Sequence, residues 1–183
     1  MFRRTALSLA LAITVAGLAP AVQAQSPSRG DARFVRDAAA GGQAEVALGQ
    51  LALQKGSSPQ VKQFAERMVA EHGQANQELL QLASSKGIAA PAQPTSQQRR
   101  DAALLGGMSG DAFDHSYARQ MVADHRTTVT LFEREARSGR DPELKAFATR
   151  LLPSLRDHLQ QARALGPDTA AGAAGTTQVP LAR

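Results

Sequence analysis

Four residues that can bind a metal ion or move a proton fall on the apolar faces of four predicted helices: Glu45, His72, His125 and His158. Each is the one strongly polar member of a stripe of apolar residues that recurs with helical spacing. A polar side chain in such a stripe faces the core, where an imidazole or a carboxylate needs a partner. A metal ion supplies that partner, because three neutral imidazoles and one carboxylate fill a four-ligand shell.

The identity of the ion stays open, because Zn²⁺, Fe²⁺, Mn²⁺ and Cu²⁺ all accept imidazole and carboxylate ligands. The alternative is a metal-free hydrogen-bond network, in which Glu45 accepts from a histidine and the polar layer fixes the register of the helices. Each of the three histidines directly follows an acid, namely Glu71, Asp124 or Asp157. These acids flank the core-facing seam, where they either contact the site, by hydrogen-bonding the ring nitrogens or as extra ligands, or form a solvated acidic face.

Capping residues, prolines and glycines divide the chain into the helices that position these side chains. Ser58-Pro59 and Asp141-Pro142 each place an N-cap residue before a proline in the first helical turn. Gly56, Gly87 and Gly139 follow helical stretches and stop them. The predicted helices span 31–55, 58–86, 109–138 and 141–166, with a short connecting helix at 96–105.

The two halves of the chain share the pattern Pro-x-(Val/Leu)-Lys-x-Phe-Ala-x-Arg, which starts at Pro59 and again at Pro142. Each half is therefore an αα-hairpin, and two hairpins joined by the long 87–108 connection make a four-helix bundle. Glu45 and His72 lie about 20 Å from the first turn, and the other two histidines lie about 25 Å from the second. In an up-down-up-down bundle both turns share one end, so we expect the four side chains to meet near mid-bundle.

The first 24 residues are typical of a cleavable signal peptide. Arg3 and Arg4 precede an apolar segment at 5–18 that is too short to span a bilayer comfortably, and Val22-Gln23-Ala24 has the small residues of a cleavage site. We expect cleavage after Ala24 and a periplasmic or secreted protein without a further membrane span. The expected order is a signal peptide at 1–24, a linker at 25–30, a helical domain at 31–166 and a disordered tail at 167–183.

Composition narrows the classes of function. The sequence has no Cys, which excludes disulfides and a lipid-anchored cysteine. Its 21 basic and 16 acidic residues give a net charge of +5, which becomes +3 when Arg3 and Arg4 leave with the signal peptide. This excess is spread along the chain, so we expect no nucleic-acid partner. A catalytic Ser/His/Asp order, a phosphate-binding loop and a nucleophile elbow are all missing, which argues against an enzyme. Protein partners stay unknown, and a homo-oligomer is compatible with the sequence.

Several runs of sequence resemble one bacterial family. The segments are 44–52, 61–72, 113–125 and 155–159. They are similar to the domain-of-unknown-function family DUF4142, whose exported members are often labelled outer-membrane proteins and are assigned a ferritin-like fold. The resemblance covers 32–165 and implies an all-α, ferritin-like up-down four-helix bundle made of two αα-hairpins joined by a long connection. It implies no particular activity, because the family has no settled one.

Ferritin-like di-iron enzymes carry a Glu-x-x-His pair on each of two helices. Here the residues three positions before the histidines are Val69, Val122 and Leu155. We therefore expect any metal site to be rich in histidine and to hold a single ion. Two functional hypotheses result. One is an exported bundle that binds one transition-metal ion, and the other is a non-catalytic envelope or stress-related module whose polar layer only fixes the helix register.

Overall fold

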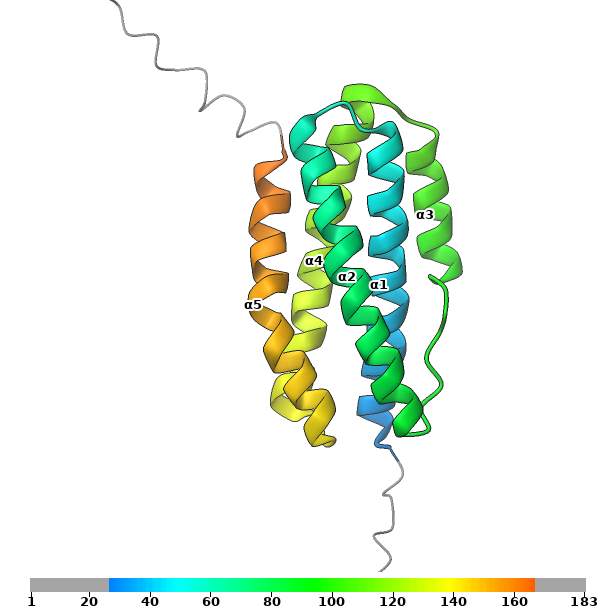
Figure 1. Ribbon diagram of the computed structural model, residues 1–183, viewed down its shortest axis with the longest axis vertical. Helices are drawn as coiled ribbons and strands as arrows, with labels where there is room; N and C mark the ends of the chain where they lie inside the picture. Colours follow the sequence, from blue (N-terminus) through cyan, green and yellow to red (C-terminus); the bar gives the residue numbers. More distant parts are fainter. Residues whose placement is uncertain (1–26, 167–183) are drawn as a thin grey trace, which may run out of the picture.

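The computed structural model describes residues 27–166, which form five helices and no strands (Figure 1). The helices agree with the sequence prediction to within two residues at each end, and the first begins inside the predicted linker. The predicted signal peptide at 1–24 and tail at 167–183 lie outside the described residues. The helices are α1 (Arg29–Lys55), α2 (Pro59–Ser85), α3 (Ser96–Gly106), α4 (Gly110–Ser138) and α5 (Pro142–Ala164).

Side-chain caps explain where the helices begin. The hydroxyl of Ser58 accepts from the backbone N–H of Val61 at the start of α2. Asp141 accepts from the backbone of Leu144 at the start of α5. Thr95 and Gln98 form a reciprocal capping box at the start of α3. Each cap satisfies donors that the first helical turn leaves without an internal partner.

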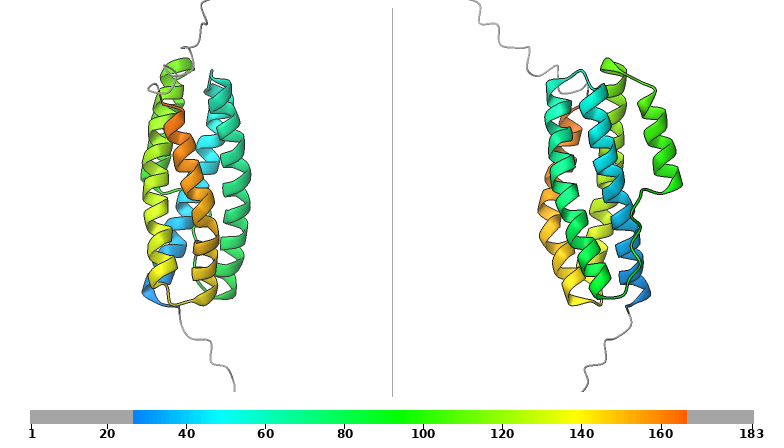
Figure 2. Two further views of the ribbon diagram at one scale, coloured as in Figure 1. Left: turned by 90° about the vertical axis from the view of Figure 1, so that its left-hand side faces the viewer. Right: turned by 45° about the vertical axis from the view of Figure 1, so that its right-hand side comes forward.

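Four of the helices form the predicted bundle of two αα-hairpins joined by a long connection, with α1 packed on α2 and α4 packed on α5. The third helix, α3, lies outside the bundle against α1 (Figure 2). The connection carries the chain back along the whole bundle, so α4 starts at the end where α1 meets α2 (Figure 1). The two hairpin turns therefore lie at opposite ends, which corrects our expectation that they share one end. None of the helices within 27–166 has the length and apolarity needed to cross a bilayer.

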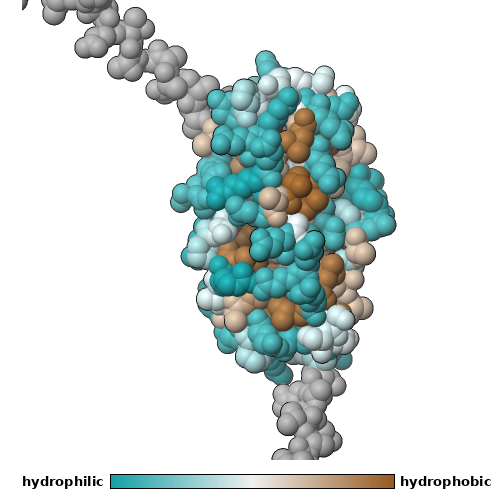
Figure 3. All heavy atoms as spheres, viewed as in Figure 1, coloured by the Kyte–Doolittle hydropathy of each residue, from teal (hydrophilic) through white to brown (hydrophobic). Residues whose placement is uncertain are grey.

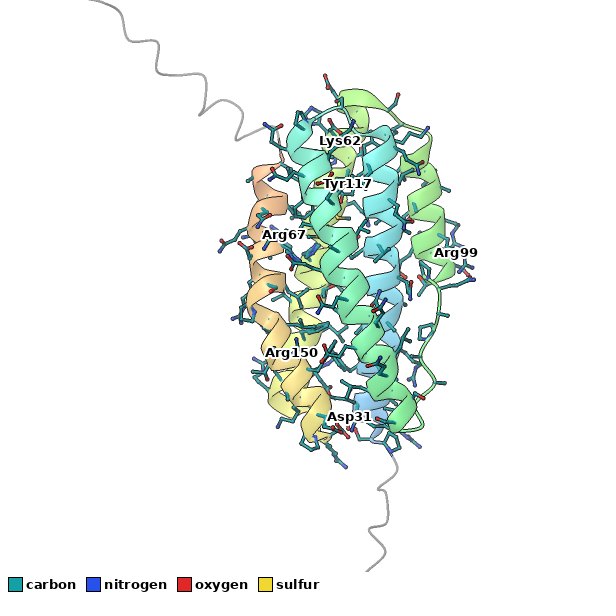
Figure 4. All side chains as sticks on the ribbon, viewed as in Figure 1. Asp31, Lys62, Arg67, Arg99, Tyr117 and Arg150 are labelled. Atoms are coloured by element: carbon teal, nitrogen blue, oxygen red, sulfur yellow. The ribbon has the colours of Figure 1, made fainter. Side chains whose placement is uncertain are left out.

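Two buried aspartates join the hairpins at the two ends of the bundle. Asp114 of α4 accepts hydrogen bonds from the backbone N–H of Ser58 at 2.7 Å and from the hydroxyl of Ser57 at 2.6 Å, in the α1–α2 turn. Asp31 of α1 accepts from the backbone N–H groups of Arg140 and Asp141, in the α4–α5 turn, at 2.9 and 3.1 Å. Each hairpin thus fixes the turn of the other, and Figure 4 shows Asp31 at its end of the bundle.

Two apolar clusters fill the bundle interior on either side of its middle. The cluster nearer the α4–α5 turn contains Phe34, Leu79, Phe132, Leu144, Phe147 and Leu155. The cluster nearer the α1–α2 turn contains Leu48, Phe64, Met68, Phe113, Tyr117 and Met121. The predicted polar residues belong to neither cluster, and they lie between the two.

Candidate metal centre

Three histidines from three helices meet in the middle of the bundle. His72 comes from α2, His125 from α4 and His158 from α5, and all three are buried. Each ring centroid lies 5.4 Å from the other two. One ring nitrogen from each histidine lies within 4.8 Å of the other two, and the Nε2 atoms of His72 and His125 are 3.4 Å apart. This triangle is close enough for one ion to bind all three rings after small adjustments.

The opposite placement of the two turns explains why the histidines share a level. A 27-residue helix such as α2 is about 40 Å long. Positions about 20 Å from one end and about 25 Å from the other therefore both fall near mid-bundle. Phe64, two turns before His72 on α2, covers the site, with its ring centroid 6.3 Å from that of His125 and 6.5 Å from that of His158.

The backbone of α4 orients the ring of His125. Nδ1 of His125 donates to the carbonyl oxygen of Met121, one turn earlier, at 2.9 Å. A neutral imidazole carries one proton, so this hydrogen bond leaves Nε2 as a lone-pair donor. Nε2 is the atom that faces His72, and it is therefore available as a metal ligand.

Glu71 orients the ring of His158. Nε2 of His158 donates to Oε2 of Glu71 at 2.9 Å, which leaves Nδ1 with its lone pair. That Nδ1 atom is buried and has no hydrogen-bond partner. Arg67 contacts Glu71 at 2.6 Å and Asp157 at 3.2 Å, on the side of α2 that faces α5 (Figure 4). Arg67, which reaches the surface, thus fixes the carboxylate of Glu71, and this carboxylate in turn orients the ring of His158.

Burial keeps the histidines neutral. Burial, together with the neighbouring rings of His125 and His158, lowers the pKa of His72 to about 3. Burial likewise lowers the pKa of His125 to about 4, although its hydrogen bond to a carbonyl opposes the shift. The pKa of His158 is also lowered by burial, with Glu71 opposing. At neutral pH all three rings therefore present lone pairs instead of positive charges.

Glu45 of α1 is buried beside the histidines, on the far side of the His125 ring. Its Oε1 lies 3.7 Å from Nδ1 of His125, the nitrogen that already donates to Met121. Burial raises the pKa of Glu45 well above its usual value, and the charge of Asp124 adds to this shift. The structure therefore groups the three histidines and places the carboxyl of Glu45 behind one of them, with Oε2 unpartnered.

The three acids that precede the histidines have different surroundings. Glu71 contacts His158, as one of the two predicted roles requires. Burial alone would raise the pKa of Glu71, but hydrogen bonds from Arg67 and His158 hold it below its usual value. Asp124 hydrogen-bonds Gln120, and Asp157 pairs with Arg67.

A cavity of about 250 Å³ opens between α2 and α5 and reaches the histidines. Sequence reasoning missed Asn76, which is buried in its wall. Gly42 of α1 was the available signal, because a Cβ at that position would lie 2.1 Å from the Asn76 side chain. Gly42 therefore makes room for a polar group on the facing helix.

Comparison with known proteins gives one family and several solved structures. The family described as Domain of unknown function (DUF4142) matches residues 16–165. The structure resembles "CopM in the Cu(II)-bound form", with a TM-score of 0.63 and 19% identity, over 73% of this chain and 93% of that chain. It also resembles "a conserved hypothetical protein, rv2844, from Mycobacterium tuberculosis", with a TM-score of 0.58 and 16% identity, over 84% and 95% of the chains. These likenesses show the helical fold. No curated protein matches the chain in sequence.

Proposed function

The chain belongs to the DUF4142 family, and we propose that it is a metal-binding bundle that holds one transition-metal ion between His72, His125 and His158. The observation that carries this proposal is the closeness of three buried ring nitrogens, all within 4.8 Å of one another. A neutral ring carries one proton, so at most one of these contacts, between the Nε2 atoms of His72 and His125, is a hydrogen bond, and the remaining lone pairs conflict because burial opposes further protons. A cation bound by all three nitrogens removes the conflict.

The hydrogen bonds around the rings support the same proposal. A histidine that binds a metal through one nitrogen usually donates from the other to a carboxylate or a carbonyl. His158 donates to Glu71 and His125 donates to Met121. Each bond sets the ring's orientation and leaves the other nitrogen for the ion. The carboxylate of Glu71 also offsets part of the positive charge that the ion brings.

Cu²⁺ and Zn²⁺ suit a site of three imidazoles better than Mn²⁺ or Fe²⁺, because affinity for nitrogen ligands rises along the first row to copper. The copper-bound title of one structural neighbour makes copper the first ion to test. Three protein ligands leave a coordination position open, which suits an exchangeable or redox-linked ion. Glu45 stands behind His125 in this proposal and contributes as a buried carboxyl group beside the site.

The proposed location is the periplasm, supported by the basic, apolar and small-residue segments within residues 1–24. The competing function is a structural or binding module of the envelope, in which the same hydrogen bonds only fix the helix register. That alternative predicts that added metal leaves the melting temperature unchanged. A large metal-dependent stabilisation contradicts it.

The proposal is tested by electron paramagnetic resonance of the protein loaded with one equivalent of Cu²⁺ after removal of metal with a chelator. We expect splitting from several imidazole nitrogens in the wild type, and a spectrum of aqueous or weakly bound Cu²⁺ in His72→Ala. His115→Ala is the matched control, because His115 is exposed near the start of α4. A spectrum of aqueous or weakly bound Cu²⁺, identical in wild type and His72→Ala, overturns the proposal.

A further inference from the structure

The cavity between α2 and α5 has an apolar half and a polar half. Phe132, Phe147, Leu79, Leu151, Leu155 and Ala38 line the apolar half. Glu45, Asn76, Thr128, Ser154 and the edges of two histidines line the polar half. Apolar atoms reach the surface along the seam between α5 and α2 in the space-filling view (Figure 3). Water satisfies a polar wall but leaves apolar walls unfavourably hydrated, so this cavity suits an occupant with one end of each kind.

Two buried polar atoms at the polar end have no hydrogen-bond partner. Oε2 belongs to Glu45, which is 3% exposed, and Nδ1 belongs to His158, which is 2% exposed. Both residues line the cavity. A buried polar atom without a partner costs free energy, typically about 1–3 kcal/mol. A hydroxyl group suits this pair because it can donate to Nδ1 of His158 and also bond the carboxyl of Glu45.

The charges around the cavity disfavour an anion. Arg150 pairs with Glu78 at the mouth and lies over the ring of Phe147, and Glu71 is paired with Arg67. Arg150, the cation among the lining residues, is thus already engaged by a carboxylate. A carboxylate ligand would have to approach these glutamates without a free positive partner, which costs both repulsion and desolvation.

We propose that this cavity binds a small, neutral aromatic molecule that carries one hydroxyl group, of which phenol is the simplest example. Its ring lies among the side chains of Phe132, Leu151 and Leu155, and its hydroxyl bonds Glu45 and His158. The volume suffices, because a dry apolar cavity of roughly 150 Å³ already holds benzene. The test therefore uses metal-free protein, because an ion bound at Nδ1 of His158 would compete with the hydroxyl for that atom.

The test is calorimetric titration of the chelator-treated wild-type protein with phenol, toluene and benzoate at pH 7. We expect saturable binding of phenol. Toluene lacks the hydroxyl and should bind about tenfold more weakly, which corresponds to about one hydrogen bond. Benzoate carries a charge and should bind at least as weakly as toluene. Absence of saturable phenol binding, or benzoate binding tighter than phenol, overturns the inference.

Two filling variants locate the site. Ala75→Phe on α2 and Ser154→Phe on α5 place a ring in the cavity from opposite walls and should each abolish phenol binding. Ala123→Phe, on an exposed face of α4, is the matched control and should bind phenol like the wild type. Helical circular dichroism checks that each variant folds. Equal phenol binding by wild type and both filling variants places the ligand elsewhere and overturns the inference.

The polar contact has its own variants. Glu45→Leu removes the hydrogen-bonding group and should weaken phenol about tenfold while leaving toluene unchanged. Glu45→Gln keeps a group of similar shape that can hydrogen-bond, and it should retain most of the affinity for phenol. Equal losses of phenol and toluene in Glu45→Leu contradict the assigned contact. Metal titration of the same variants separates the two proposals. A variant that loses phenol binding but still binds metal tests the cavity proposal and leaves the metal-centre proposal unaffected.

Discussion

Nε2 of His158 lies 2.9 Å from Oε2 of Glu71, and Arg67 contacts the other oxygen of that carboxylate at 2.6 Å. This chain of contacts links a buried ring to the surface between α2 and α5. The carboxylate fixes which nitrogen of His158 carries the proton, and so which one is free to bind an ion. Glu71 therefore positions His158 without being a metal ligand itself, and the two roles can be tested separately.

Replacing Glu71 tests this role. Glu71→Gln should weaken metal binding by about 10–100-fold, because the amide neither fixes the protonated nitrogen as well nor offsets the charge of the ion. The affinity is measured by competition with a chelator of known strength. Glu66→Gln is the matched control, since Glu66 is exposed on the same helix. Equal metal affinities of wild type and Glu71→Gln would contradict the positioning role of Glu71.

The pH dependence of the metal-free protein tests the burial of the histidines. In the unfolded chain an imidazole takes up a proton near pH 6.5, whereas the pKa is about 3 for His72 and about 4 for His125 in the folded protein. Below pH 6.5 the unfolded state thus binds more protons, and stability must fall as the pH falls. We expect these two groups to contribute a loss on the order of 3 kcal/mol between pH 7 and pH 5, which carboxyl groups of raised pKa such as Glu135 offset in part.

Urea unfolding at each pH measures this loss. His72→Phe should show a shallower dependence, because one of the depressed groups is gone, while His115→Ala should follow the wild type. Equal pH dependences of wild type and His72→Phe from pH 7 to pH 5 would mean that His72 is not held neutral.

Glu135 gives the opposite dependence in the other half of the bundle. Burial, together with the charge and the hydrogen bond of the neighbouring Asp31, raises its pKa to about 7. Between about pH 4.5 and pH 7 the folded state therefore holds a proton that the unfolded state releases, and this contribution to stability is lost as the pH rises. In the wild type this group should lower the unfolding free energy by about 3 kcal/mol as the pH rises over that range, and Glu135→Gln should abolish this decrease.

The difference in unfolding free energy between wild type and Glu135→Gln, measured from pH 4.5 to pH 8, isolates this group from the histidines. We expect the unfolding free energy of the variant, relative to that of the wild type, to rise steadily up to pH 7 and to stay constant above pH 7. A difference that does not change with pH would contradict the raised pKa.

Asp114 should matter for stability without affecting the metal centre. Asp114→Ala removes the acceptor of the backbone N–H of Ser58 and of the hydroxyl of Ser57, and it should cost about 3 kcal/mol in urea unfolding. Asp111→Ala is the matched control, because Asp111 contacts the same hydroxyl from an exposed position. Equal effects of the two substitutions would argue against the role of Asp114 in joining the hairpins.

Much of the fold could be predicted from the sequence because its signals are local. Caps and prolines at Ser58-Pro59 and Asp141-Pro142 mark the turns, and the apolar stripes identify the core-facing sides. The end at which each turn lies could not be predicted, because it depends on the path of the connection through α3. Tertiary contacts, such as the one between Asp31 and the α4–α5 turn, carry that information.

The candidate site was partly predictable for the same reason. Helical periodicity correctly indicated that His72, His125, His158 and Glu45 face inward. It could not tell which atoms meet, since that depends on side-chain directions and on small shifts between helices. The choice between Glu45 and Glu71 as the carboxylate in contact with a histidine Nε2 is an example, because Glu71 reaches the site from the edge of α2.

The central claim is tested most directly by metal content. Chelator-treated protein is dialysed against Cu²⁺ and, separately, Zn²⁺, and the bound ion is measured by elemental analysis. The account predicts one ion per chain in the wild type and in His115→Ala, and none above background in His72→Ala, His125→Ala and His158→Ala. Bound metal should also raise the melting temperature of the wild type by about 10 °C at a hundredfold excess over Kd. Sub-stoichiometric metal that is unchanged in His72→Ala and His125→Ala would contradict the account.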